Sequence, residues 1–99
     1  MTKITLKLLK SLGLTPKEIK RWKEQDGVEV FDRYPDSPID KYLKDFEQTN
    51  IVSKSGEFTQ WEGWWDLTLY LYRKGEKFAI RVDDYVTGGG SDSTVYLFQ

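Results

Sequence analysis

The alternation of apolar and polar residues between positions 64 and 86 most constrains what this chain can fold into. From Trp64 to Tyr72, apolar side chains recur at every second residue, which is the period of a strand with one buried face. A second alternating stretch runs from Lys77 to Val86, and Lys74-Gly75 lies between the two, where a hairpin would turn. The pattern predicts an antiparallel hairpin, followed by a closing strand from Thr94 to Gln99. The side chains expected to face the core from these strands are Trp65, Leu67, Leu69, Leu71, Phe78, Ile80, Val82, Val95 and Leu97.

Before residue 50 the spacing is typical of helices instead. A first helix is expected from Thr5 to Leu12, with Thr5 as its N-cap and Gly13 at its end. The alternation of Ile4, Leu6 and Leu8 would also suit a strand, but the spacing of the leucines by three and four residues favours the helix.

Two further helices carry start signals. For the second, Thr15 suits the N-cap, Pro16 the first helical position and Glu18 the capping box, while Gly27 is a natural stop. The third is expected to begin after Ser37. Its apolar stripe would consist of Ile39, Tyr42, Leu43 and Phe46.

The remaining segments suggest short strands and loops. Short strands are predicted at Val28–Phe31, Ile51–Val52 and Phe58–Trp61, and loops at Ser53–Gly56 and Thr87–Ser93. Because helices come first and an antiparallel meander second, an α+β fold is expected. It would have about three N-terminal helices packed on one face of a three- to five-stranded, mainly antiparallel C-terminal sheet.

The length of 99 residues suits a single domain, residues 1–99. Residues 1–49 are expected to be mainly helical and residues 50–99 to form an antiparallel β meander. Charge divides in a similar way. Residues 1–26 hold seven Lys/Arg against three Asp/Glu, a net charge of +4, and the remainder holds eight against thirteen, a net charge of −5. A basic N-terminal end on an acidic body suggests two surfaces with different partners.

Missing residue types narrow the function. The chain has no Cys and no His, which excludes a disulfide scaffold, a zinc finger, a Cys nucleophile and a His-based triad. A non-enzymatic protein with no catalytic residue, no cofactor and no metal site is therefore expected. Lys3, Lys7 and Lys10 interrupt the first apolar stretch, and no apolar run is long enough to span a membrane. These features favour a cytoplasmic protein that is not secreted and has no membrane partner.

Residues 5–25 resemble a helix-turn-helix, because Gly13 falls at the turn between two helices that apolar residues would hold together. Two features depart from that motif: the first helix carries the large Leu9 where a small residue is usual, and Glu24 dilutes the basic face. The alternative is a plain helical hairpin with a solvated basic face. If the segment binds duplex DNA, the candidate contacts are Thr15, Lys17, Lys20, Arg21 and Lys23.

The second candidate surface is the outward face of the sheet. If one face of each strand is buried, the pleat turns an unusual number of aromatic residues outward, and Tyr, Trp and Arg are frequent in interface hot spots. The alternatives are that cross-strand tyrosine pairs only stabilise the sheet, or that residues 61–65 fold over this face. The candidate partner-binding residues are Trp64, Asp66, Tyr70, Tyr72, Arg81, Asp83, Tyr85 and Tyr96, and Phe98 is also expected on this face.

These features predict a small protein-binding protein, acting as an inhibitor or adaptor that docks on a macromolecular partner through an aromatic and acidic sheet face. Phage-encoded inhibitors of host defence, including anti-CRISPR proteins, and toxin-neutralising immunity proteins are of this kind, although no motif assigns the chain to either. The alternative is a helix-turn-helix DNA-binding regulator that uses its strands to form a homodimer.

Overall fold

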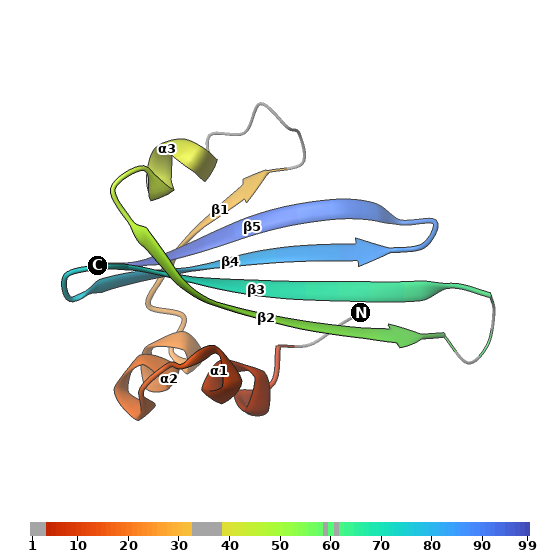
Figure 1. Ribbon diagram of the computed structural model, residues 1–99, viewed down its shortest axis with the longest axis horizontal. Coiled ribbons are helices and arrows are strands. Elements are labelled where there is room, and N and C mark those ends of the chain that lie inside the picture. Colours follow the sequence, from red (N-terminus) through yellow and green to blue (C-terminus); the bar gives the residue numbers. More distant parts are fainter. Residues whose placement is uncertain (1–3, 33–38, 59, 61) are drawn as a thin grey trace.

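Figure 1 shows a computed structural model of the chain, which describes residues 4–32, 39–58, 60 and 62–99. The described residues form three helices and one antiparallel sheet of five strands, in the order β1-β5-β4-β3-β2. The α+β class and the antiparallel sheet are therefore confirmed. Along the chain the elements are α1 (Leu6–Leu12), α2 (Pro16–Lys23), β1 (Val28–Asp32), α3 (Ile39–Leu43), β2 (Glu47–Glu57), β3 (Trp64–Lys74), β4 (Lys77–Val86) and β5 (Gly90–Phe98).

The central hairpin of β3 and β4 confirms the strongest sequence pattern. Leu69 lies opposite Val82 and Leu71 opposite Ile80, and all four side chains are buried. Gly75 turns the chain with a φ of +59°, a conformation that glycine adopts without steric cost. Alternation therefore identified both the pairing and the buried side of these two strands.

The first two helices also begin where their caps predict. The Thr5 side chain accepts a hydrogen bond from the Leu8 N–H at the start of α1. At the start of α2, Thr15 and Glu18 form both hydrogen bonds of a capping box. Helix α1 stops at Gly13, whereas α2 ends at Lys23, before the predicted stop at Gly27.

Two side chains fasten the corner between α1 and α2 to the sheet. Asn50 Nδ2 donates a hydrogen bond to the Leu12 carbonyl oxygen at 2.7 Å. Both terminal nitrogens of Arg73 donate to the Glu18 carboxylate, at 2.7 and 3.1 Å, and one also donates to the Gly13 carbonyl oxygen at 3.4 Å. A carboxylate at the start of α2 thus joins the helix to β3.

Replacing Glu18 with Gln is expected to lower the free energy of unfolding by about 0.5–2 kcal/mol at neutral pH. Gln can keep the hydrogen bond to the Thr15 N–H but loses the charge that Arg73 contacts. Burial alone raises the pKa of Glu18. Hydrogen bonds from Arg73 and the Thr15 backbone, with the positive charge of Arg73, outweigh burial and hold that pKa below its ordinary value of 4.5.

The stabilisation from Glu18 is therefore fully present above pH 4.5, and it is lost as the pH falls through the lowered pKa of the folded protein. Urea unfolding of the wild type and Glu18→Gln over a pH series measures it. The two free energies should differ by a constant amount near neutrality and converge in acid. At a pH where Glu18 is protonated in both the folded and the unfolded protein, the two free energies of unfolding should no longer differ. If their difference is as large there as at neutral pH, the charge of Glu18 does not have the role given to it.

Strand β2 corrects one prediction. The loop predicted at Ser53–Gly56 is instead strand, because β2 runs without interruption from Glu47 to Glu57 along β3. An edge strand needs no alternating apolar residues, because it pairs through its backbone and leaves most of its side chains exposed. The sequence also predicts a strand at Phe58–Trp61. Phe58 follows the end of β2 and is not in a strand, and Thr59 and Trp61 lie outside the described residues.

The predicted loop at Thr87–Ser93 is also too long. Strand β5 already begins at Gly90, so only residues 87–89 form the turn after β4. Gly88 and Gly90 have φ of +84° and +86°, a conformation that favours glycine at these two positions. Polar residues 91–94 look like a loop in the sequence, yet Ser91 and Ser93 pair with Tyr85 and Asp83 of β4.

The described residues contain two hydrophobic clusters, one on each face of the sheet, where the helices pack against it. The first joins leucines of α1 and Ile19 of α2 to buried residues of β3, β4 and Phe98. The second joins Ile39 and Leu43 of α3 to Ala79, Val95 and Leu97. Because Ala79 lies opposite Leu97 and Phe78 opposite Phe98, the clusters occupy opposite faces. The expectation of helices on only one face is therefore not met.

This arrangement corrects the predicted orientation of β5. Val95 and Leu97 are buried as expected, but on the α3 face, whereas Tyr96 and Phe98 face the same side as Leu69 and Leu71. Alternation could not decide the phase, because residues 95–98 are all apolar or aromatic and α3 buries the second face. The N-cap predicted at Ser37 lies outside the described residues, and α3 ends at Leu43 rather than continuing to Phe46.

Candidate functional site

Seven of the eight residues predicted to bind a partner lie on one face of the sheet, and six of these seven lie outside the hydrophobic clusters. On β3 and β4, Tyr70 is directly opposite Arg81, and Asp66 is directly opposite Tyr85. The three aromatic residues of these six, Trp64, Tyr70 and Tyr85, belong to neither hydrophobic cluster of the described residues. In Figure 1 the helices gather near the turn between β3 and β4, while the strands project beyond them. We call this surface the open face; it consists of Trp64, Asp66, Tyr70, Arg81, Asp83 and Tyr85.

The middle of the open face is held by a network around Asp83. The Asp83 carboxylate accepts hydrogen bonds from Arg81 Nε at 3.0 Å and from the Ser93 hydroxyl at 2.7 Å. The Arg81 guanidinium in turn lies over the Tyr70 ring, 5.4 Å from its centre. Three strands therefore contribute to one connected set of side chains, which fixes the position of the tyrosine ring.

Ionisation in this network follows from its contacts. Burial and the charge of Asp83 raise the pKa of Tyr70, so that its hydroxyl stays protonated. Burial alone lowers the pKa of Arg81, but the hydrogen bond and charge of Asp83 outweigh this and raise it. The network thus presents a neutral phenol beside an ion pair, and the side chains of Arg81 and Asp83 remain 29% and 30% exposed.

Aromatic rings form the outer part of the open face. The rings of Trp64 and Tyr85 lie 6.0 Å apart between centres and are inclined by 42°. Thr87 fixes the backbone of Trp64, since its hydroxyl accepts from the Trp64 N–H and its own N–H donates to the Trp64 carbonyl oxygen, both at 3.0 Å. Trp64 is 47% exposed, so it remains available for contact.

The other two predicted partner-binding residues do not belong to the open face. Tyr72 shares the face but packs against the cluster under α3, and its hydroxyl donates to Gln48 Oε1 at 3.2 Å. Tyr96 faces the opposite side of the sheet, where its ring contacts Trp22 edge to face at 4.8 Å. Its placement on the partner-binding face is wrong for the reason given for β5. Phe98 is buried rather than outward.

No protein-family model, curated protein or solved structure matches this chain. What the open face can bind therefore has to follow from its own chemistry. Among the described residues, no three Asp or Glu side chains come together in a group that could hold a metal ion. In the same part of the chain, no helix is long and apolar enough to cross a membrane.

Some of the residues proposed for DNA contact already bind other residues of the chain, and others are exposed. Thr15 is used as the cap of α2, and Lys20 lies 3.8 Å from Glu24. Lys17 and Lys23 are exposed. The helical hairpin itself is present, with Leu9 buried in the cluster against the sheet.

Arg21 is the most engaged of these basic residues. Its Nε donates to Asp26 at 2.6 Å and its Nη2 donates to the Gln99 carbonyl oxygen at 3.1 Å. The guanidinium also lies 5.7 and 5.6 Å from the ring centres of Phe78 and Phe98. These contacts give Arg21 a structural role and leave mainly lysines for a nucleic acid.

Sequence reasoning missed two contributors to the open face. Ser93 completes the Asp83 network, but it falls in the segment predicted as a loop. Ile51 of β2 is 54% exposed and pairs with Tyr70, so it adds apolar surface beside the ring. The correct length of β2 and β5 would have revealed both, because each is then opposite a predicted site residue.

Proposed function

We propose that this chain is a protein-binding domain that docks on its partner through the open face, as an inhibitor or adaptor does. The observation that carries the proposal is a set of partly exposed aromatic and charged side chains, held in fixed positions and left uncovered by the hydrophobic clusters of the described residues. A large uncovered aromatic surface is typical of an interaction site.

The residue types support this role. Tyr, Trp and Arg are the side chains that most often dominate binding energy at protein interfaces. Trp64, Tyr70, Arg81 and Tyr85 supply all three types within two neighbouring strands. The exposed Ile51 extends the apolar part of the surface.

Rigidity supports it as well. Binding costs about 0.5–1.5 kcal/mol for each flexible side chain that becomes immobilised. Asp83 restrains Arg81, whose guanidinium lies over the Tyr70 ring, and the Trp64 ring lies against Tyr85. The open face would lose little side-chain freedom on docking.

Charge indicates what the partner looks like. Asp66, Asp83 and the neighbouring Glu57 of β2 outnumber Arg81, so the surface is net negative. A partner patch that combines apolar contacts with Lys or Arg would complement it, whereas nucleic acid phosphates would be repelled. This charge favours a protein over a nucleic acid as the ligand of the open face.

Photocrosslinking from the open face tests the proposal. A benzoylphenylalanine placed at position 85 in the full chain, expressed in its native host, should give a discrete adduct with a protein. The same probe at position 42 is the matched control, because Tyr42 is a 46% exposed tyrosine on α3, outside the open face. The partner identified from the adduct is then purified and its affinity measured.

With the purified partner, Tyr70→Ala and Trp64→Ala should each weaken binding by more than about 1 kcal/mol, which is at least fivefold. Tyr42→Ala should leave the affinity unchanged, and circular dichroism should show that all three variants remain folded. Adducts only from position 42, or full affinity in both open-face variants, would exclude this surface. Duplex DNA binding at low salt that is abolished by Lys17→Glu with Lys20→Glu, which leaves the structural Arg21 in place, would favour the DNA-binding alternative instead.

A further inference from the structure

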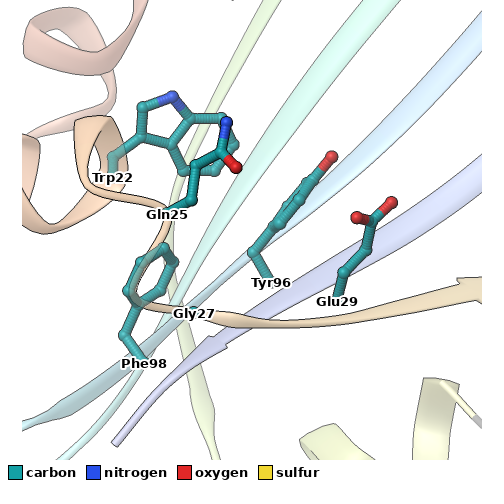
Figure 2. Close-up of a pocket in the computed structure, with 6 residues that line it drawn as sticks. All are labelled: Trp22, Gln25, Gly27, Glu29, Tyr96 and Phe98. Carbon is teal, nitrogen blue, oxygen red and sulfur yellow. The ribbon is translucent and has the colours of Figure 1, made fainter.

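A pocket of about 270 Å³ lies on the opposite side of the sheet, between the end of α2 and the start of β1 (Figure 2). It is separate from the open face, because Tyr96 in its wall points away from that face. Pockets that hold drug-sized ligands measure roughly 300–1,000 Å³, so this one suits a small group. Its lining residues are Trp22, Gln25, Gly27, Glu29, Tyr96 and Phe98.

Three of the lining side chains are aromatic and are set at angles to one another. The Trp22 and Tyr96 rings are inclined by 69° with their centres 4.8 Å apart, and Trp22 is inclined by 37° to Phe98 at 6.2 Å. Figure 2 shows these rings bordering one recess, with Gln25 beside the indole. The electron-rich faces of such rings attract cations.

The floor of the pocket depends on Gly27. A Cβ atom at this position would lie 2.8 Å from Phe98 Cζ, closer than such atoms normally approach. Phe98 cannot move aside easily, because it stacks on Phe78 with ring centres 4.5 Å apart. The missing side chain therefore lets the backbone between α2 and β1 lie directly on the ring.

The pocket is negatively charged. Glu29 is its one ionisable carboxylate and lies directly opposite Tyr96 on the neighbouring strand. Burial and the charge of Glu29 raise the pKa of Tyr96, as expected for a phenol near a carboxylate. The six lining residues include no Lys or Arg. Arg21 contacts Phe98 from outside this set, and Asp26 lies 2.6 Å from its Nε.

We propose that this pocket binds a methylated ammonium group, with the contacting rings of Trp22 and Tyr96 forming one wall beside the cation and the Glu29 carboxylate balancing its charge. A primary ammonium such as that of lysine is strongly hydrated and needs hydrogen-bond acceptors around it. A methylated ammonium presents methyl groups to the rings and retains its positive charge, which is the combination that aromatic cages recognise.

Titration of the ¹⁵N-labelled full chain with choline, followed by NMR, tests the site. Saturable shifts are expected for the Trp22 indole N–H, assigned by its absence in Trp22→Phe, and for the amides of residues 25–29 and 96. The dissociation constant should be on the order of 1 mM. The uncharged probe 3,3-dimethylbutan-1-ol has the same shape as choline and should bind about 2–30-fold more weakly, which is the strength of one cation–π contact.

Two variants separate the charge from the rings. Tyr96→Leu keeps an apolar side chain but removes the ring, and it should weaken choline binding by roughly 2–30-fold. Glu29→Gln changes only an exposed side chain on β1 and should weaken choline but not the uncharged probe. Glu24→Gln is the matched control, because Glu24 is an exposed carboxylate at the end of α2 that does not line the pocket.

The methylated ammonium could come from a free head group or from a methylated lysine of a protein. A peptide containing trimethyllysine that binds at least about tenfold more tightly than choline, while the unmethylated peptide does not, would support a protein source. Equal affinity of choline and the peptide would support a head group. The proposal would be overturned if neither choline nor the trimethyllysine peptide gave saturable shifts. Equal affinities for choline and its uncharged analogue would also overturn it.

Discussion

Replacing Phe98 with Ala is expected to lower the free energy of unfolding by about 3–5 kcal/mol. The side chain is 2% exposed. Its ring stacks on Phe78 with an interplanar angle of 2°, and Gly27 lies against its edge. Truncation would leave a cavity between the sheet and α2 that these neighbours cannot fill without moving backbone. Urea unfolding followed by far-ultraviolet circular dichroism measures the loss.

Trp64→Ala provides the contrast, since alternation along the strands predicted both Trp64 and Phe98 to point outward. Trp64 is 47% exposed and contacts mainly Tyr85, so its loss should cost no more than about 1.5 kcal/mol. Equal losses for the two variants, or a smaller loss for Phe98→Ala, would show that β5 does not have the orientation described here.

Leu69→Ala is expected to cost about 2–5 kcal/mol, because Leu69 is completely buried in the middle of β3, which lies between β4 and β2 in the sheet. The adjacent residue serves as its control. Tyr70 faces the other side, where the Arg81 guanidinium lies over its ring, so Tyr70→Ala should cost about 1 kcal/mol.

Urea midpoints and slopes for the pair decide whether β3 has the assigned phase. If Tyr70→Ala proves as destabilising as Leu69→Ala, Tyr70 belongs to a core, and its effect on partner binding could no longer be separated from unfolding. Unchanged slopes would show that both variants unfold from equally compact states.

The sequence was most informative where one physical constraint acted alone. The caps at Thr5 and Thr15 and the alternation of β3 each have one explanation, and all are confirmed. Alternation failed at residues 95–98, because α3 makes the second face of the sheet apolar as well. It also failed along β2, where pairing through the backbone leaves no pattern in the exposed side chains.

The regularity of the alternation also explains which residues of the candidate site were predicted correctly. Residues of β3 and β4 were placed on the correct face because their alternation is regular. Tyr96 was misplaced with the rest of β5, and Ser93 was missed because its segment resembled a loop. The pocket around Trp22 and Glu29 could not have been predicted, since it depends on how α2 meets the edge of the sheet.

Pairing of β1 with β5 has a consequence for the order in which the chain can fold. Val28 lies opposite Leu97, and among the described residues β5 is the one strand that pairs with β1. Until residues 90–98 have been synthesised, β1 has no partner and Phe78 has no ring to stack against. Contacts between such distant residues form slowly. The hairpin of β3 and β4 can therefore assemble early, while closure of the sheet waits for β5.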